Sequence, residues 1–88
     1  MKKIYYDTKK NVISKQLKLA RVKEGLSQSQ LAARMQTLGV SIDQQMISRI
    51  EANARMVTDY ELASFSRALH VPPEELLKDF MEDITNAP

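Results

Sequence analysis

The sequence contains no cysteine and no tryptophan, and its only histidine is His70. Without cysteine there is neither a disulfide framework nor a thiolate metal site, and one histidine cannot supply the several imidazole ligands of a typical zinc site. No apolar run reaches the roughly 20 residues that cross a bilayer, so we expect no membrane-spanning helix. The absence of cysteine and of a signal-peptide pattern predicts a cytoplasmic protein.

Glycine and proline are also scarce, with two and three residues in a chain of 88. There is little material for hairpins, and apolar residues do not alternate with polar ones over the length of a strand, which predicts an all-α fold. The length suits a single domain with one modest core. There is no second histidine, no cysteine and no glycine-rich phosphate loop, and the chain has no capacity for a closed pocket, so we expect no enzyme activity and no cofactor.

Charge is unevenly distributed along the chain, although the net charge is only +2. Residues 1–55 carry 11 Lys and Arg against 4 Asp and Glu, and residues 56–88 carry 2 against 7. A basic half and an acidic half are expected where the basic half meets a polyanion. A basic helix that is simply solvated would explain the charge equally well.

The spacing of apolar residues and capping residues predicts five short helices within a domain of residues 11–81. We expect residues 1–10 to form a basic arm and residues 82–88 a frayed tail. Lys2 and Lys3 in the arm could follow a phosphate backbone or could be solvated. The predicted helices, with their flanking residues, are Asn11 to Gly25, Ser27 to Gly39, Asp43 to Asn53, Thr58 to His70 and Pro72 to Met81.

The segment Asp43–Glu51 combines an apolar stripe, Ile47 and Ile50, with polar residues that can face outward. Glutamine can pair in a bidentate way with adenine, and arginine can do so with guanine. The preceding helix offers small residues, Ala32 and Ala33, for close packing against this segment. This arrangement predicts a helix-turn-helix, with Asp43–Glu51 as the helix that reads the major groove.

An ordered set of residues extends this pattern over residues 12–77. The set is Ile13-x3-Leu17-x2-Ala20-Arg21, Gly25-Leu26-Ser27-Gln28-Ser29-Gln30-Leu31-Ala32, Ile47-Ser48-Arg49-Ile50-Glu51, Ala68-Leu69-His70-Val71 and Glu75-Leu76-Leu77. It resembles the phage-repressor/Cro-like (XRE-type) helix-turn-helix family. The resemblance implies a compact five-helix, lambda-repressor-like fold, no catalysis, and binding to pseudo-palindromic operators as a dimer.

The resemblance also implies roles for individual residues. Base contacts are expected from Gln44, Gln45, Ser48 and Arg49, phosphate contacts from Ser27, Gln28, Asn53 and Arg55, and a structural ion pair from Arg21 and Glu51. If that ion pair is buried, loss of one partner should cost about 3–5 kcal/mol. Met46 could join the core or touch a thymine methyl, and His70 is expected to cap the fourth helix or to be exposed.

Two departures from the family pattern stand out. Five extra residues, Gln36–Val40, lengthen the second helix and its connection, so the angle of the third helix does not follow from the resemblance. Asn53 stands where the family usually has glycine, and asparagine can also take a positive φ.

These observations predict a transcriptional regulator, in the first place a repressor, that binds double-stranded DNA as a homodimer. Surplus apolar residues in the C-terminal helix, such as Phe80 and Met81, make this helix the candidate dimer contact. The alternative is an antitoxin-like or adaptor module that uses the same fold chiefly to bind another protein.

Overall fold

The computed structural model describes residues 8–86, and within this range the secondary structure consists of five α-helices. The helices are α1 (Ser14–Lys23), α2 (Gln28–Thr37), α3 (Gln44–Glu51), α4 (Asp59–Ala68) and α5 (Pro73–Asn86). The predicted five-helix fold is therefore confirmed, whereas Lys2 and Lys3 of the arm lie outside the described residues. None of the helices in residues 8–86 combines the length and the hydrophobicity of a membrane-spanning segment.

Short-range capping explains where the middle helices begin. Ser27 begins α2 and Thr58 begins α4, each in a reciprocal capping box with the residue three positions later. At the start of α3 the Asp43 side chain accepts from the Met46 backbone N–H, while the Met46 sulfur accepts from the Asp43 backbone N–H. A thioether thus occupies the place that Glu or Gln takes in an ordinary capping box.

A single core joins all five helices. α1 packs on α3 and α5, α2 packs on α3 and α4, and α4 packs on α5. The core residues are Ile13, Leu17, Leu31, Ala32, Met35, Val40, Ile42, Ile47, Ile50, Phe65, Ala68, Leu69 and Leu76. Of the two predicted packing alanines, Ala32 lies in the core and Ala33 is exposed.

The extra residues between α2 and α3 are accommodated by the last turn of α2 and a short loop. Gly39 follows α2 with a φ of +81°, a conformation that favours glycine. Val40 and Ile42 then enter the core, and the Gln36 side chain donates to the Ile42 carbonyl. The loop is therefore held at two apolar points, which fixes the position of α3 against α2.

α1 begins later than the sequence predicts, at Ser14 with Ile13 as the capping residue. The predicted cap, Asn11, lies two residues earlier and is buried. Its amide nitrogen donates to the carbonyls of Ile50 and Arg55, and its oxygen accepts from the Ile13 N–H. Asn11 was misassigned because the partners that hold it lie about 40 residues away in the sequence, where local pattern gives no signal.

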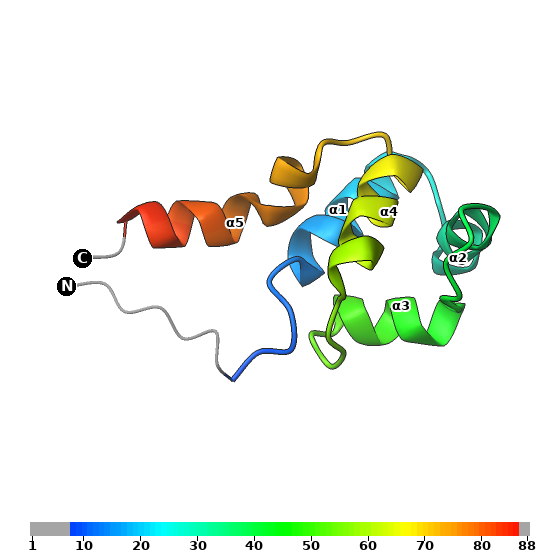
Figure 1. Ribbon diagram of the computed structural model, residues 1–88, viewed down its shortest axis with the longest axis horizontal. Helices are drawn as coiled ribbons and strands as arrows, with labels where there is room; N and C mark the ends of the chain where they lie inside the picture. The colour runs from blue at the N-terminus through cyan, green and yellow to red at the C-terminus, as the bar shows by residue number, and fades with distance from the viewer. Residues whose placement is uncertain (1–7, 87–88) are drawn as a thin grey trace.

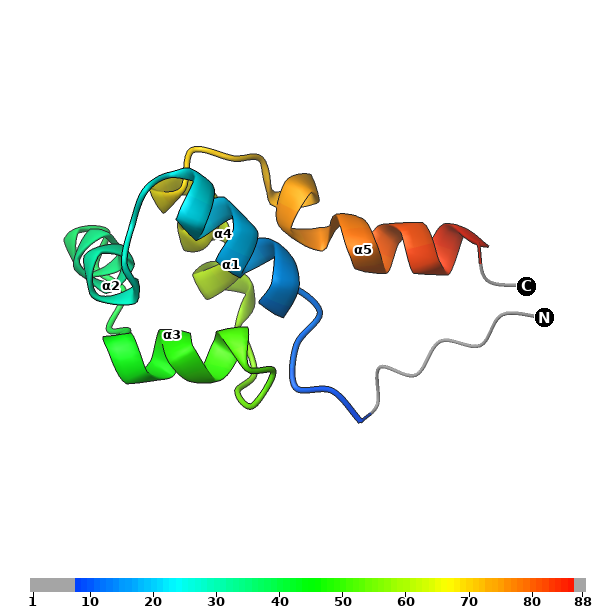
Figure 2. The same ribbon diagram turned by 180° about the vertical axis from the view of Figure 1, so that it is seen from behind.

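α5 is longer than predicted, and it extends away from the other helices (Figures 1 and 2). Only Leu76, near its start, is fully buried. Residues 82–86, predicted as part of a frayed tail, are helical. The helix continues because no proline or glycine interrupts it before Pro88, and because Met81 and Ile84 continue its apolar side.

Candidate nucleic-acid interface

α3 lies along one side of the molecule, with its outward face uncovered by the other helices (Figure 1). Ile47 and Ile50 are completely buried under it, as predicted. The remaining predicted reading residues are Gln44, Gln45 and Arg49, which are exposed, and Ser48, which is half-buried. The structure therefore brings the four predicted base-contact residues onto the uncovered surface of α3.

A chain of hydrogen bonds ties the first residue of α3 to its last residue through α2. The Gln44 amide nitrogen donates to the Gln28 amide oxygen at 2.7 Å, and the Gln28 amide nitrogen donates to Glu51 Oε1 at 3.1 Å. A carboxylate only accepts hydrogen bonds, so Glu51 determines which group donates and which accepts in both hydrogen bonds. Within residues 8–86, the Gln44 amide oxygen and its second N–H have no hydrogen-bond partner, which leaves both groups for DNA or another molecule.

Arg21 and Glu51 form a bidentate pair that holds the end of α3 against α1. Arg21 Nε donates to Glu51 Oε2 at 2.6 Å and Nη2 donates to Oε1 at 3.0 Å. The side chains are only 11% and 5% exposed, and the hydrogen bonds that Arg21 donates to Glu51 raise the pKa of Arg21. A third donor, Nη1, binds the Leu26 carbonyl before α2, so the pair links three elements.

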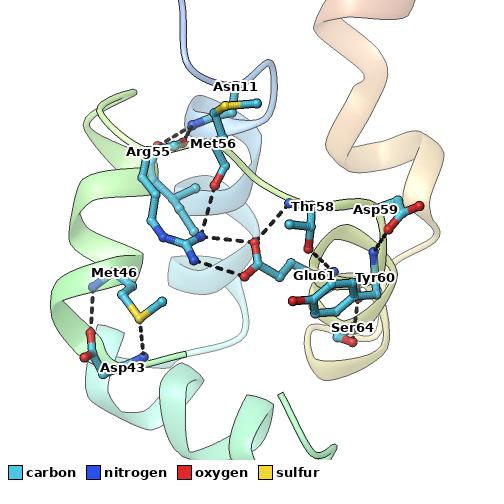
Figure 3. A network of polar contacts seen from close by, with 11 residues as sticks. Asn11, Asp43, Met46, Arg55, Met56, Thr58, Asp59, Tyr60, Glu61 and Ser64 are labelled. Carbon is cyan, nitrogen blue, oxygen red and sulfur yellow. Dashed lines mark hydrogen bonds and ion pairs between the residues drawn. The ribbon is translucent and has the colours of Figure 1, made fainter. Parts of the chain in front are cut away.

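A second partly buried pair, which was not predicted from the sequence, joins the loop after α3 to α4 (Figure 3). Both terminal nitrogens of Arg55 donate to the Glu61 carboxylate, at 3.0 and 3.1 Å. Burial favours a raised pKa for Glu61, but the hydrogen bonds from Arg55 and from the Thr58 backbone outweigh it and lower the pKa. The spacing Thr58-x-x-Glu61 indicates the capping box at the start of α4, but it gives no signal for Arg55, which lies six residues before Glu61.

The residues predicted to contact phosphate occupy two places. Ser27 and Gln28 lie at the start of α2, beside the first turn of α3 through the Gln28–Gln44 contact. Asn53 and Arg55 lie in the loop after α3. The phosphate contacts of all four residues stay predictions. Arg55 binds Glu61, the Asn53 oxygen accepts from two backbone N–H groups, and the Gln28 amide is bonded to Gln44 and Glu51.

Comparison with known proteins gives the same picture. The sequence matches the helix-turn-helix family model over residues 17–76. The restriction-modification controller protein C.AhdI from Aeromonas hydrophila is 28% identical, with a TM-score of 0.64 over 73% of this chain and 86% of that chain. A point mutant of the restriction-modification controller protein C.Esp1396I is 26% identical, with a TM-score of 0.67 over 84% of this chain and 92% of that chain.

A hypothetical transcription factor, NHTF from Neisseria, shares the fold with a TM-score of 0.68 at 21% identity, over 93% of this chain and 92% of that chain. No match to a curated protein was found. The family model covers α2, α3 and most of the core around them. The chain therefore belongs to the XRE-type helix-turn-helix family of DNA-binding transcriptional regulators.

Proposed function

We propose that this protein represses transcription by binding a specific DNA sequence with α3 in the major groove. The observation that supports this most is the chain of hydrogen bonds from Gln44 through Gln28 to Glu51, which orients a reading side chain before DNA is present. Preorganisation of this kind lowers the entropy cost of binding. It has no evident purpose on a merely solvated helix face.

The base contacts follow from the chemistry of each exposed side chain. Gln44 and Gln45 can each present an amide oxygen and an N–H to adenine, and Arg49 can bind guanine O6 and N7. Ser48, which is half-buried, can approach a base edge at close range. Half of the eight residues of α3 can therefore form hydrogen bonds with base edges, as expected for a helix that reads the major groove.

Contacts to the phosphates would set the register of α3 in the groove. Ser27 and Gln28 are suited to this at the positive end of α2, where backbone N–H groups also point outward. On the other side of α3, Asn53 and Arg55 would have to share their intramolecular partners with a phosphate. The side chains of Ser27 and Gln28 also have intramolecular partners. We place the stronger phosphate contacts at the start of α2 because the backbone N–H groups there can bind a phosphate without breaking those side-chain contacts.

We further propose that the protein binds its operator as a homodimer joined through α5. The projecting part of α5 carries Met81 and Ile84, which are 47% and 41% exposed. A dimer with twofold symmetry would place two copies of α3 about 34 Å apart, one turn of the duplex. The selected DNA site should then be pseudo-palindromic.

Selection of bound duplexes from a random library, followed by fluorescence anisotropy at fixed salt, tests the proposal. We expect the double variant Gln45→Ala/Arg49→Ala to lose at least about 30-fold of its preference for the selected site over a scrambled one, since each bidentate contact supplies about 1–3 kcal/mol of discrimination. Arg67→Ala, which removes an exposed arginine from the last turn of α4, is the matched control and should keep the preference.

Two outcomes would contradict the proposal. The first is a wild-type protein that binds no duplex even at low salt. The second is a double variant whose preference equals that of the wild type. Absent DNA binding together with a partner protein whose co-purification requires α5 would favour the alternative, an adaptor-like module.

A further inference from the structure

The N-terminal arm is anchored to the loop after α3 through its last residue, Lys10, and through Asn11, which follows it. The backbone N–H groups of Lys10 and Asn11 both donate to the Asn53 side-chain oxygen, at 2.9 and 3.0 Å. In the reverse direction, the buried Asn11 amide nitrogen donates to the carbonyls of Ile50 and Arg55, each at 3.0 Å. Four hydrogen bonds therefore join residues 10–11 to the segment 50–55.

Asn53 is suited to this position by its backbone as well as by its side chain. It follows α3 with a φ of +58°, a conformation that asparagine adopts more readily than most residues. Its own N–H donates to the Ile50 carbonyl, which closes the end of α3. The side-chain oxygen is thus presented from a fixed turn, and the position of the arm is set relative to α3.

Thr8, Lys9 and Lys10 are exposed. In both views, the described part of the arm descends to the same side of the molecule as α3 and the loop that follows it (Figures 1 and 2). An eight-residue helix is about 12 Å long, which is about the width of the major groove. With α3 lying across the groove, groups just beyond each of its ends would lie near the backbones that border the groove.

We propose that the arm root, residues 8–11, is a second contact to the DNA backbone, in which Lys10 binds a phosphate beside the C-terminal end of α3. This inference rests on the proposed function, because it takes α3 to lie in the major groove. It assigns a positioning role to Asn53, in place of the direct phosphate contact predicted from the sequence. Asn53 acts through the arm that it holds.

Titration of the selected operator over a series of salt concentrations tests the contact. The slope of log K against log salt is negative, and loss of one phosphate contact makes it shallower by about 0.9. We therefore expect Lys10→Gln to show this loss and to bind roughly five- to tenfold more weakly at 0.1 M salt. The loss should be equal on specific and scrambled DNA, because a phosphate contact carries no sequence information.

Lys23→Gln is the matched control. Lys23 is also an exposed lysine, but it ends α1 beside His70 and Glu75, at the opposite end of that helix from the arm root. We expect its slope to equal that of the wild type. If wild type, Lys10→Gln and Lys23→Gln share one slope, the arm-root contact is wrong while the proposed function stands. If the wild type binds no DNA, it is the proposed function that fails.

The role of Asn53 is tested by Asn53→Gly, which keeps the positive φ and removes the side-chain oxygen. We expect Asn53→Gly to reproduce the slope of Lys10→Gln. The combined variant Lys10→Gln/Asn53→Gly should bind DNA no more weakly than either single variant. Slope losses that add in the double variant would overturn the positioning role and show that Asn53 contacts a phosphate itself. Circular dichroism tests whether each variant is folded. If Asn53→Gly fails to fold, Lys10→Gln, which changes an exposed side chain, still tests whether Lys10 binds a phosphate.

Discussion

Glu61 shows how one buried side chain can serve two structural elements. Its carboxylate accepts from the Thr58 backbone N–H, which begins α4, and from Arg55 in the preceding loop (Figure 3). The carboxylate side chain is only 4% exposed, so its charge depends on these partners. The pair therefore holds the loop after α3 on the body of the domain, close to the residues that anchor the arm.

We expect Arg55→Ala to destabilise the fold by about 2–4 kcal/mol, because it leaves the buried Glu61 without its charged partner. The value lies toward the lower part of the range for buried pairs, since Arg55 itself stays partly exposed. Urea unfolding followed by circular dichroism measures the change. A loss below about 0.5 kcal/mol, the size expected for a surface pair, would contradict the argument.

The same carboxylate predicts how stability depends on pH. The pKa of Glu61 is lower in the folded protein than its ordinary value of 4.5. Its contribution is therefore complete above about pH 4.5 and is lost as the pH falls through the lower folded pKa. We expect Glu61→Gln to be less stable than wild type at pH 7 and to lose less stability on acidification. Thermal melts between pH 7 and pH 3 measure this, with the exposed Glu75→Gln as control, and parallel profiles for wild type and Glu61→Gln would refute it.

At the scale of the element, α3 combines an acidic cap with a surface proposed to meet DNA. Asp43 accepts from the Met46 N–H, and it is exposed. Asparagine caps a helix as well as aspartate does, whereas alanine costs about 0.5–2 kcal/mol. We therefore expect Asp43→Asn to keep the stability of the fold and Asp43→Ala to lose about 1 kcal/mol.

DNA binding should separate these two variants further. Asp43→Asn removes a negative charge at the start of α3, so we expect tighter binding than wild type at low salt, with the difference shrinking as salt screens the charge. Anisotropy titrations at two salt concentrations provide the measurement. Unchanged binding by Asp43→Asn would place the start of α3 away from the phosphates, and weaker binding would contradict the charge argument.

The elements that could be predicted from the sequence are those specified by neighbouring residues. Ser27 and Thr58 begin helices through partners three residues away, and the apolar spacing of Ile47 and Ile50 gives the buried face of α3. The contacts that hold Asn11 could not be predicted, because they join residues 39 to 44 positions apart and depend on the packing of α1 against α3. The length of α5 was underestimated for a related reason. Most of the helix lies outside the core, so few buried apolar residues mark where it ends.

At the scale of the whole molecule, the two charge halves of the sequence correspond to two parts of the fold. Residues 1–55, with an excess of basic residues, include α1 to α3 and the arm root, and residues 56–88, with an excess of acidic residues, include α4 and α5. An acidic helix that projects from the domain is repelled by phosphates. The charge distribution therefore favours an orientation in which α3 and the arm root face DNA and α5 meets another protein surface.

This orientation leads to a prediction for assembly. Met81 and Ile84 lie on the projecting part of α5, and a contact between two copies would bury both residues twice. Burying such a side chain is worth about 1.5–3 kcal/mol, so we expect Met81→Glu/Ile84→Glu to raise the dimer dissociation constant at least about 100-fold. Analytical ultracentrifugation measures the constant. The affinity for a full palindromic site should fall as the dimer weakens, while binding to one half-site is retained.

Val22→Glu, which changes an exposed apolar residue of α1, is the control and should leave the dimer intact. A double variant that remains dimeric would place the interface elsewhere, and a wild-type protein that stays monomeric on its operator would exclude the dimer itself.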